Sequence, residues 1–279
     1  MDPPALTGAH ALVTGASRGI GAALARAFAD AGAAVTVTAR TAEPTPGRLE
    51  GSLAEVVEEI RGTGGSTAGG PPVLAIAADS TDAGERRRVV DEAIAAQGPV
   101  TILVNNAAVT WFAPVASFDD RRFGLMMELQ VRAPFHLAQL VLPGMRQAGR
   151  GWILNVSSLV ARHPAGPPYR GPHGGTVYGM CKAALERFTT GLAAEVHADG
   201  IAVNVLSPSR VVPTPGTIHH RLVGRPGQVV EPPERFAAAA LALCTGDPAT
   251  VTGRVTTTDE VLGPDPAVTP AARSAARAR

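Results

Sequence analysis

Short apolar runs alternate along this chain with segments in which apolar residues recur every three or four positions. Such runs are typical of buried parallel strands, and the recurrence is typical of helices with one apolar face. The predicted strands are residues 11–14, 33–39, 73–78, 100–104, 151–157, 201–207 and a short seventh at 254–258. Because crossovers between parallel strands are right-handed, the alternation predicts a single α/β domain. It would hold a Rossmann-type, doubly wound parallel sheet of about seven strands, with helices on both faces and ligands at the carboxyl ends of the strands.

Two stretches interrupt this alternation. Residues 41–72 contain one predicted helix, around 53–60, and then a segment from 62 to 72 that is rich in Gly, Pro, Ser and Thr and predicts a surface loop. The tail, residues 263–279, carries Pro, Ala and Arg without apolar periodicity, which favours disorder. The folded domain is therefore expected to span residues 1–262.

Composition excludes several classes of protein. The 279 residues carry a formal net charge of +1 with acidic and basic groups interspersed, which does not indicate a nucleic-acid-binding surface. Two cysteines, Cys181 and Cys244, provide no disulfide framework and fit a reducing compartment. The chain start lacks the features of a secretory signal, and the longest apolar run, residues 236–244, is too short to cross a bilayer. We expect a cytoplasmic protein with no nucleic-acid or membrane partner, and His219–His220 lacks the further ligands of a metal site.

Glycines follow the first predicted strand. Gly15 would permit a tight turn, Gly19 would let the backbone approach a pyrophosphate, and Gly21 would allow the following helix to pack closely on the strand. Free N–H groups at the start of that helix would face the phosphates. An ordinary glycine turn is the alternative, but the second strand at 33–39 completes the βαβ context that a dinucleotide site requires.

Tyr178 and Lys182 are four residues apart in a segment predicted to be helical, so their side chains would lie on one face, one turn apart. A phenol titrates near ~10 in water, and a neighbouring ammonium group favours the phenolate and lowers that pKa. Such a pair suits proton transfer at neutral pH. The spacing alone also arises by chance in helices, and Cys181, which would face another side, is expected to be a packed apolar residue.

In their order along the chain these motifs resemble the classical subgroup of the short-chain dehydrogenase/reductase superfamily, over residues 8–262. The resemblance rests on Gly15-x-x-x-Gly19-x-Gly21, Asp79 after the third strand, Asn105-Asn106-Ala107 after the fourth, Ser157-Ser158 after the fifth, and Tyr178-x-x-x-Lys182. A finer likeness, in residues 39–44 and 213–216, is to citronellol dehydrogenases and hydroxysteroid dehydrogenase-like proteins.

This resemblance implies hydride transfer between a nicotinamide cofactor and a carbonyl or alcohol carbon of a small hydrophobic alcohol, ketone or aldehyde. Tyr178 would donate or accept the proton, and Lys182 would lower the Tyr178 pKa and bind the nicotinamide ribose. Ser158 would hydrogen-bond the substrate oxygen as charge develops. In the family an Asn holds a water of a proton relay, and Gln130 stands at the matching position of this chain.

The resemblance also implies the cofactor contacts. Asp79 and Ser80 would meet the adenine, residues 105–107 would line its ribose, and the Val211 backbone would hold the nicotinamide carboxamide, with a hydroxyl added by Thr214. The full set of expected cofactor-binding residues is Gly15, Ser17, Arg18, Gly19, Ile20, Gly21, Arg40, Thr41, Asp79, Ser80, Asn105, Ala107, Tyr178, Lys182, Val211 and Thr214.

The choice of cofactor depends on charge at the end of the second strand. A carboxylate there would favour NAD, but this chain has Arg40 and no acidic residue before Glu43. Arg18 lies in the glycine turn, and two converging guanidinium groups would bind a 2′-phosphate. NADP(H) is therefore the expected cofactor, with NAD(H) as the alternative, unless the arginines merely face solvent.

The chain departs from the family pattern at several positions. Gln130 replaces the relay Asn, while Ala108 and Ser209 each replace a glycine. The gap between Ser158 and Tyr178 is lengthened by a Pro- and Gly-rich loop, residues 163–175, whose Tyr169 is expected to line the pocket. The departures leave two other functions open: a catalytically silent NADP-binding or scaffold protein, and an isomerase or dehydratase that keeps its cofactor.

The helix that carries Tyr178 also predicts an assembly. Its apolar stripe is more extensive than contact with one sheet would need, and in relatives this helix packs against another subunit, so a homodimer or homotetramer is expected. The stripe consists of Ala183, Ala184, Leu185, Phe188, Leu192, Ala193 and Val196.

Overall fold

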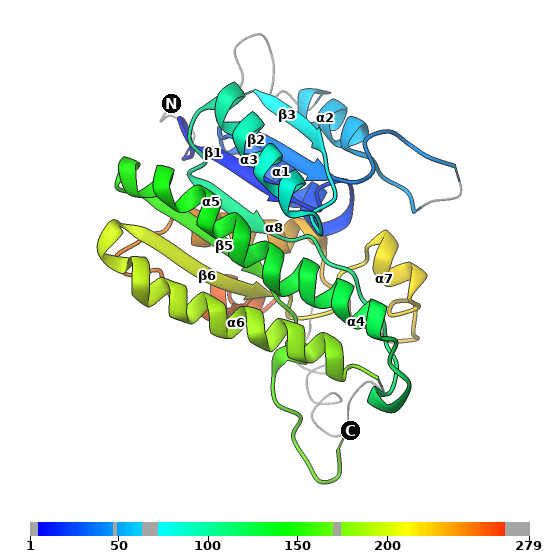
Figure 1. Cartoon of the computed structure of the whole chain (residues 1–279). Helices are drawn as coiled ribbons and strands as arrows, with labels where there is room; N and C mark the ends of the chain where they lie inside the picture. Colours follow the sequence, from blue (N-terminus) through cyan, green and yellow to red (C-terminus); the bar gives the residue numbers. More distant parts are fainter. Residues whose placement is uncertain (1–4, 47–48, 63–71, 170–173, 266–279) are drawn as a thin grey trace.

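A computed structural model of the chain describes residues 5–46, 49–62, 72–169 and 174–265. Within these ranges seven parallel strands form one sheet in the order β3-β2-β1-β4-β5-β6-β7 (Figure 1). The strands are β1 His10–Thr14, β2 Ala34–Ala39, β3 Val73–Ala77, β4 Ile102–Asn105, β5 Gly151–Val156, β6 Ile201–Ser207 and β7 Val255–Thr257. The order reverses at β1, so a crevice opens between the ends of β1 and β4, where doubly wound sheets bind ligands.

Helices cover both faces of the sheet (Figure 1). Helices α1, α2 and α8 pack on one face, around buried Phe28 and Phe236, whereas α3, α5 and α6 pack on the other. The helices are α1 Gly19–Asp30, α2 Leu53–Gly62, α3 Ala83–Gln97, α4 Asp120–Met127, α5 Ala133–Ala148, α6 Thr176–Val196, α7 Pro215–His219, α8 Pro233–Thr245 and α9 Thr258–Leu262. A π-helical segment, Glu128–Arg132, joins α4 to α5.

The predicted doubly wound fold is confirmed. Side chains of β1 alternate between the two cores, since Ala11 and Val13 join one and Leu12 joins the other, and every described residue of the strand is buried. The fourth strand begins two residues later than predicted, at Ile102, and the fifth ends at Val156. The interpretations of the loop at 62–72 and of the tail fall largely outside the described residues.

Two surface predictions need correction. In the apolar stripe of α6, Leu185, Leu192, Ala193 and Val196 are buried within the subunit, because they face its own sheet. Only the Ala183, Ala184 and Phe188 part of the stripe stays partly exposed.

Tyr169, expected to line the pocket, is 74% exposed, and its ring lies over Gly166 of its own loop.

No helix in the described ranges is both long enough and apolar enough to span a membrane.

Candidate active site

The turn between β1 and α1 can be made only with glycine at three positions. Gly15 and Gly19 have φ of +64° and +55°, in the left-handed region that side chains disfavour. A Cβ on Gly15 would lie 2.7 Å from Cα of Ala107, and a Cβ on Gly21 would collide with the Gly15 carbonyl oxygen. The expected residues Ser17, Arg18 and Ile20 lie on the same turn, next to the start of α1, where backbone N–H groups suit an anion.

Asn106, which lies in the segment expected to line the adenosine ribose, braces this turn with its side chain. Its amide Nδ2 donates to the carbonyl oxygens of Thr14, at 2.9 Å, and Gly15, at 3.1 Å. Ala107 N donates to the Thr14 hydroxyl at 3.1 Å. The segment after β4 is therefore tied directly to the glycine turn.

Asn105 makes different contacts from those expected. Its side chain is buried and donates from Nδ2 to Asn155 Oδ1 at 2.8 Å, and Asn155 in turn donates to the Thr189 hydroxyl at 2.8 Å. This ladder joins β4, β5 and α6. The Asn105 amide therefore braces the sheet, and only the backbone of residues 105–107 remains to line a ribose.

Arg18, one of the two arginines expected at a 2′-phosphate, is bonded to other parts of the chain. Arg18 donates to the carbonyl oxygens of Leu49, at 2.8 Å, and Gly51, at 2.9 Å, and to the hydroxyl of Thr41 at 3.1 Å. It thereby holds the segment after β2 against the glycine turn. Arg40 is exposed beside that segment, so a single guanidinium faces solvent at the end of β2.

Asp79 lies at the end of the neighbouring strand β3. Its Oδ1 accepts from the Thr81 backbone N–H at 2.9 Å and hydroxyl at 2.8 Å. Partial burial acts to raise the pKa of Asp79, but the two hydrogen bonds from Thr81 and the positive charge of Arg40 outweigh it, so this pKa is lowered. Asp79 is a carboxylate at neutral pH, close enough to Arg40 to sense its charge.

Three hydroxyl groups meet at the carboxyl edge of the sheet. Tyr178 comes from the first turn of α6, Ser158 follows β5 and Thr110 follows β4. Burial raises the pKa of the Tyr178 phenol, while hydrogen bonds with the Ser158 and Thr110 hydroxyls favour the phenolate and act in the opposite direction. The sequence did not indicate Thr110, which no motif or spacing singles out.

Lys182 lies one helical turn beyond Tyr178 and is 3% exposed. Its Nζ donates to the Val156 carbonyl oxygen at 2.8 Å and lies 5.8 Å from the centroid of the Tyr178 ring. Burial lowers the pKa of Lys182 to about 8, although the negative charge of Glu186 acts to raise it. The expected lowering of the Tyr178 pKa by this ammonium needs correction, because burial of the phenol dominates and raises that pKa, and Lys182 is directed at the strand carbonyl.

Gln130 is placed by the π-helical segment. Its side chain is 1% exposed, and Nε2 donates to the Val109 carbonyl oxygen at 2.9 Å. In the described part of the chain its Oε1 has no hydrogen-bond partner. Gln130 therefore fixes the backbone next to Thr110, and π-turns of this kind recur at functional sites.

A buried arginine holds the π-helical segment in place. Arg86, 2% exposed, donates to Glu128 Oε1 at 2.8 Å, to the Ser80 carbonyl oxygen at 2.7 Å and to His136 Nδ1 at 3.0 Å. Burial lowers the pKa of His136, and the charge of Arg86 lowers it further. One side chain thus joins the loop after β3 to the segment that carries Gln130.

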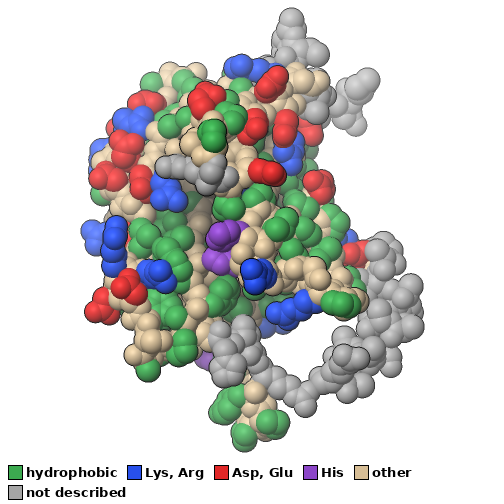
Figure 2. Space-filling model, turned by 90° about the vertical axis from the view of Figure 1, so that its right-hand side faces the viewer, with side chains coloured by type: hydrophobic (Ala, Val, Ile, Leu, Met, Phe, Trp, Pro, Cys, Tyr) green, Lys and Arg blue, Asp and Glu red, His purple; other side chains and the backbone are tan. Residues whose placement is uncertain are grey.

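Aromatic side chains form a wall beside Tyr178. Phe112 meets the Tyr178 ring edge-on at 6.1 Å and the His220 ring edge-on at 6.2 Å. Figure 2 looks onto this edge of the molecule, where histidine side chains lie among hydrophobic ones. Thr214, which begins α7, packs so closely on the glycine turn that a Cβ on Gly19 would lie 2.8 Å from its Cγ2.

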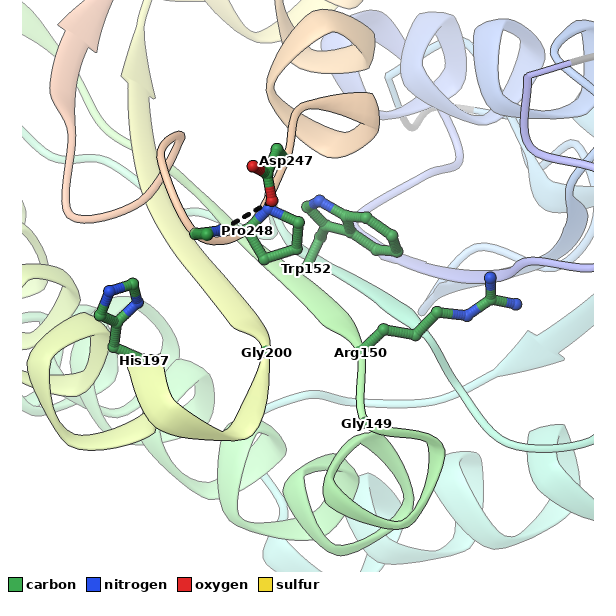
Figure 3. A pocket seen from close by; sticks show the side chains of 8 residues that line it. Gly149, Arg150, Trp152, His197, Gly200, Asp247 and Pro248 are labelled. Atoms are coloured by element: carbon green, nitrogen blue, oxygen red, sulfur yellow. Dashed lines mark hydrogen bonds between the residues drawn. The ribbon is translucent and has the colours of Figure 1, made fainter.

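A separate cavity of about 330 Å³ opens at the amino ends of β5 and β6 (Figure 3). Trp152, His197 and Asp247 line it, and the Trp152 indole N–H and one Asp247 oxygen are bonded to the backbone of residues 246 and 249. It is at the opposite end of the sheet from Tyr178. The described residues contain no group of three or more His, Cys, Asp or Glu side chains arranged to hold a metal ion.

Comparison with known proteins agrees with this arrangement. The sequence profile of the family described as short chain dehydrogenase matches residues 9–221. A short chain dehydrogenase of Pseudocercospora fijiensis is 35% identical over 208 residues, which are 74% of this chain and only 60% of that protein. The 7alpha-hydroxysteroid dehydrogenase of Escherichia coli (strain K12) is 33% identical over 263 residues, 90% of this chain and 93% of that protein. The crystal structure of a metagenomic short-chain oxidoreductase in complex with NADP is similar with a TM-score of 0.71 and 28% identity, over 90% of this chain and 97% of that one.

Proposed function

The chain belongs to the short chain dehydrogenase family, a family of NAD(P)-dependent oxidoreductases, and from that premise we propose that it is an alcohol dehydrogenase or carbonyl reductase for small hydrophobic substrates. The observation that carries the proposal is the meeting of the Ser158, Thr110 and Tyr178 hydroxyls beside a buried lysine. The aromatic wall of Phe112 and His220 favours an apolar, ring-containing substrate.

The residues present fit a nicotinamide dinucleotide. Gly15, Gly19 and Gly21 leave a turn that a Cβ would fill, at the start of a helix whose N–H groups suit a pyrophosphate. When bound, the cofactor supplies or accepts the hydride. We assign Asp79 and Ser80 to the adenine, the backbone of residues 105–107 to its ribose, and Val211 and Thr214 to the nicotinamide end.

Proton transfer is assigned to the chain's own side chains. Tyr178 gives its phenol proton to the substrate oxygen in reduction and removes it in oxidation. Ser158 donates a hydrogen bond to the same oxygen as negative charge develops there. The Lys182 ammonium, held by the Val156 carbonyl, supplies positive charge and binds the nicotinamide ribose. Gln130 holds the backbone at Val109 in place by a hydrogen bond to its carbonyl.

NADP(H) is the cofactor we propose, with NAD(H) as the weaker alternative. The support is the exposed cation Arg40, which follows β2 where a carboxylate would select NAD. Arg18 contributes indirectly, because it holds Thr41 and the segment that follows. The lowered pKa of Asp79 keeps a negative charge one strand away, on the side assigned to the adenine.

We further propose that residues 1–262 are the catalytic unit and that it works as a homo-oligomer. A groove of about 520 Å³ lies between α5 and α6. Phe135, 47% exposed, meets Phe188 edge-on there at 6.0 Å, and Arg187 and Glu195 flank the pair with opposite charges. A twofold axis through this groove would pair equivalent surfaces.

The experiment is a panel of aliphatic, terpenoid, aromatic and steroid alcohols and ketones, assayed with both cofactors and repeated with Tyr178→Phe. We expect turnover to fall by about 10³-fold or more in Tyr178→Phe, because the transferable proton is lost. Binding of NADPH, followed by its fluorescence, should be nearly unchanged. Tight binding without turnover by the parent protein would favour the silent binding protein, and a variant within tenfold of the parent would remove Tyr178 from its role.

A further inference from the structure

One buried carboxylate outside the site described so far closes the segment after β6. Residues 212–230 leave the sheet and return at Glu231, whose N–H donates to the Val211 carbonyl oxygen at 3.0 Å. The Glu231 side chain also accepts at Oε2 from the backbone N–H groups of Ser209, at 2.8 Å, and Arg210, at 3.2 Å. A single residue thus makes three hydrogen bonds to the short stretch 209–211.

Burial of the Glu231 carboxylate costs desolvation free energy. It is 0% exposed, and among the described residues its Oε1 has no hydrogen-bond partner. Burial raises the pKa of Glu231, against the effects of the Thr258 hydroxyl and of the Ser209 and Arg210 N–H groups. An uncharged acceptor would close the loop with less desolvation, so closure alone does not explain a carboxylate here.

The segment that Glu231 closes reaches both halves of the site. Thr214 packs against Gly19 of the glycine turn, and His220 packs against Phe112, which in turn contacts Tyr178. The backbone of 209–211, which Glu231 holds, begins this segment. A small rotation at Ser209 would therefore displace Thr214 and His220 together.

A cluster of charges around Asp259 holds residues 209–211 from the other side. Arg210 and Arg235 both pair with Asp259 at 3.0 Å, and Asp259 N donates to the Ser209 hydroxyl at 2.8 Å. Stretch 209–211 is therefore held between α9 and Glu231. The backbone there is fixed at the N–H groups of Ser209 and Arg210 and at the carbonyl of Val211.

We propose that Glu231 is a positioning residue for hydride transfer: its buried carboxylate fixes the backbone of Ser209 and Arg210 and thereby orients Val211 toward the nicotinamide. The inference rests on the proposed function, which places the nicotinamide carboxamide on the Val211 backbone. Charged acceptors form shorter and stronger hydrogen bonds to N–H groups than neutral ones, so the carboxylate holds the backbone of residues 209–211 more rigidly.

The test compares Glu231→Gln with the matched control Glu234→Gln, an exposed glutamate in the first turn of α8. In Glu231→Gln we expect kcat to fall by about tenfold, as expected for a small misplacement of reacting groups, and NADPH to bind about fivefold more weakly. Amide hydrogen exchange of a peptide covering 208–212 should quicken without cofactor. The unfolding midpoint should stay within about 4 °C of the parent, because relief of the buried charge offsets the weaker bonds.

The readouts separate the two proposals. If the parent turns over no substrate, the proposed oxidoreductase activity fails, but exchange and NADPH binding still test Glu231. If Glu231→Gln keeps the parent's exchange, NADPH affinity and kcat, the positioning role is overturned. A fall in activity that merely follows a loss of thermal stability, shared by Glu234→Gln, would overturn it as well.

Discussion

Lys182 is the only lysine in the chain, so its ionisation can be measured without interference. We predict that its side-chain amine titrates near 8, because burial lowers the pKa from 10.5 to about that value. Its Nζ donates to the Val156 carbonyl, and the nearby charge of Glu186 only partly compensates the lost hydration. The amine should therefore change charge close to physiological pH.

The same shift predicts a pH-dependent cost in stability. A pKa lowered from 10.5 to about 8 corresponds to about 3 kcal/mol. The folded protein binds fewer protons than the unfolded chain between these values, so stability rises with pH through this window. The cost is fully present below pH ~8 and has gone above pH ~10.5.

Replacing the lysine should reveal that cost. Lys182→Met keeps most of the length and removes the charge, and we expect turnover to be lost. At pH ~7 the free energy of unfolding should rise by about 2 kcal/mol, which is the electrostatic gain less about 1 kcal/mol for the hydrogen bond to Val156. Near pH ~10 the variant's advantage should largely disappear.

Two measurements check this. Protein labelled with isotopic lysine gives a single side-chain NMR signal, whose titration reports the pKa directly, and urea unfolding at both pH values compares parent, Lys182→Met and Lys182→Arg. Arginine keeps its charge throughout, so Lys182→Arg should not become more stable between the two pH values relative to Lys182→Met. A titration near ~10, or the same stability difference between parent and Lys182→Met at both pH values, would refute the reasoning.

Three further predictions concern other parts of the site and surface. Thr110→Val should move the rising limb of the alcohol-oxidation pH profile upward by up to about one pH unit, because the phenolate loses a hydrogen bond; a profile identical to that of Thr110→Ser would contradict this. Arg40→Asp should weaken NADPH binding about tenfold or more and raise the affinity for NADH relative to that for NADPH. If titration with both cofactors shows an unchanged preference, Arg40 does not bind the 2′-phosphate. Phe188→Glu should shift light scattering of the dilute protein toward the monomer, since it places a charge in the groove between α5 and α6, whereas an active parent that is already monomeric would rule out the assembly.

The sequence predicted most of the fold because the information was local. Residues 201–207 form a strand with the predicted bounds, since all but one of them are apolar or small enough to be buried between two helical layers. The exception, Asn204, is buried with its amide bonded to the backbone of Val251 and Arg254. The glycine turn was predictable for the same reason, because left-handed φ values and close backbone approach require glycine at those positions.

The rest depended on contacts between distant segments. Asn105 bonds to Asn155, fifty positions away, and no local sequence pattern around either residue indicates that they pair. The expected effect of Lys182 on Tyr178 followed from helical spacing, but desolvation of both groups is set by the surrounding chain. Thr110 and Glu231 were missed because a hydroxyl or a carboxylate in an irregular segment has no pattern that marks it.

The π-helical segment Glu128–Arg132 has a consequence for how this protein can be altered. A π-turn holds one residue more than an α-turn, so α4 and α5 are separated by a single insertion within an otherwise continuous helix. Pro134 has no N–H to donate to the preceding turn, so an uninterrupted α-helix cannot replace this arrangement. Deleting Leu129 would change the rotation of Gln130 relative to α4 by about 100°. Gln130 would then turn away from the Val109 carbonyl, to which it donates. A one-residue deletion, ordinarily the mildest change to chain length, would here displace a buried side chain of the site.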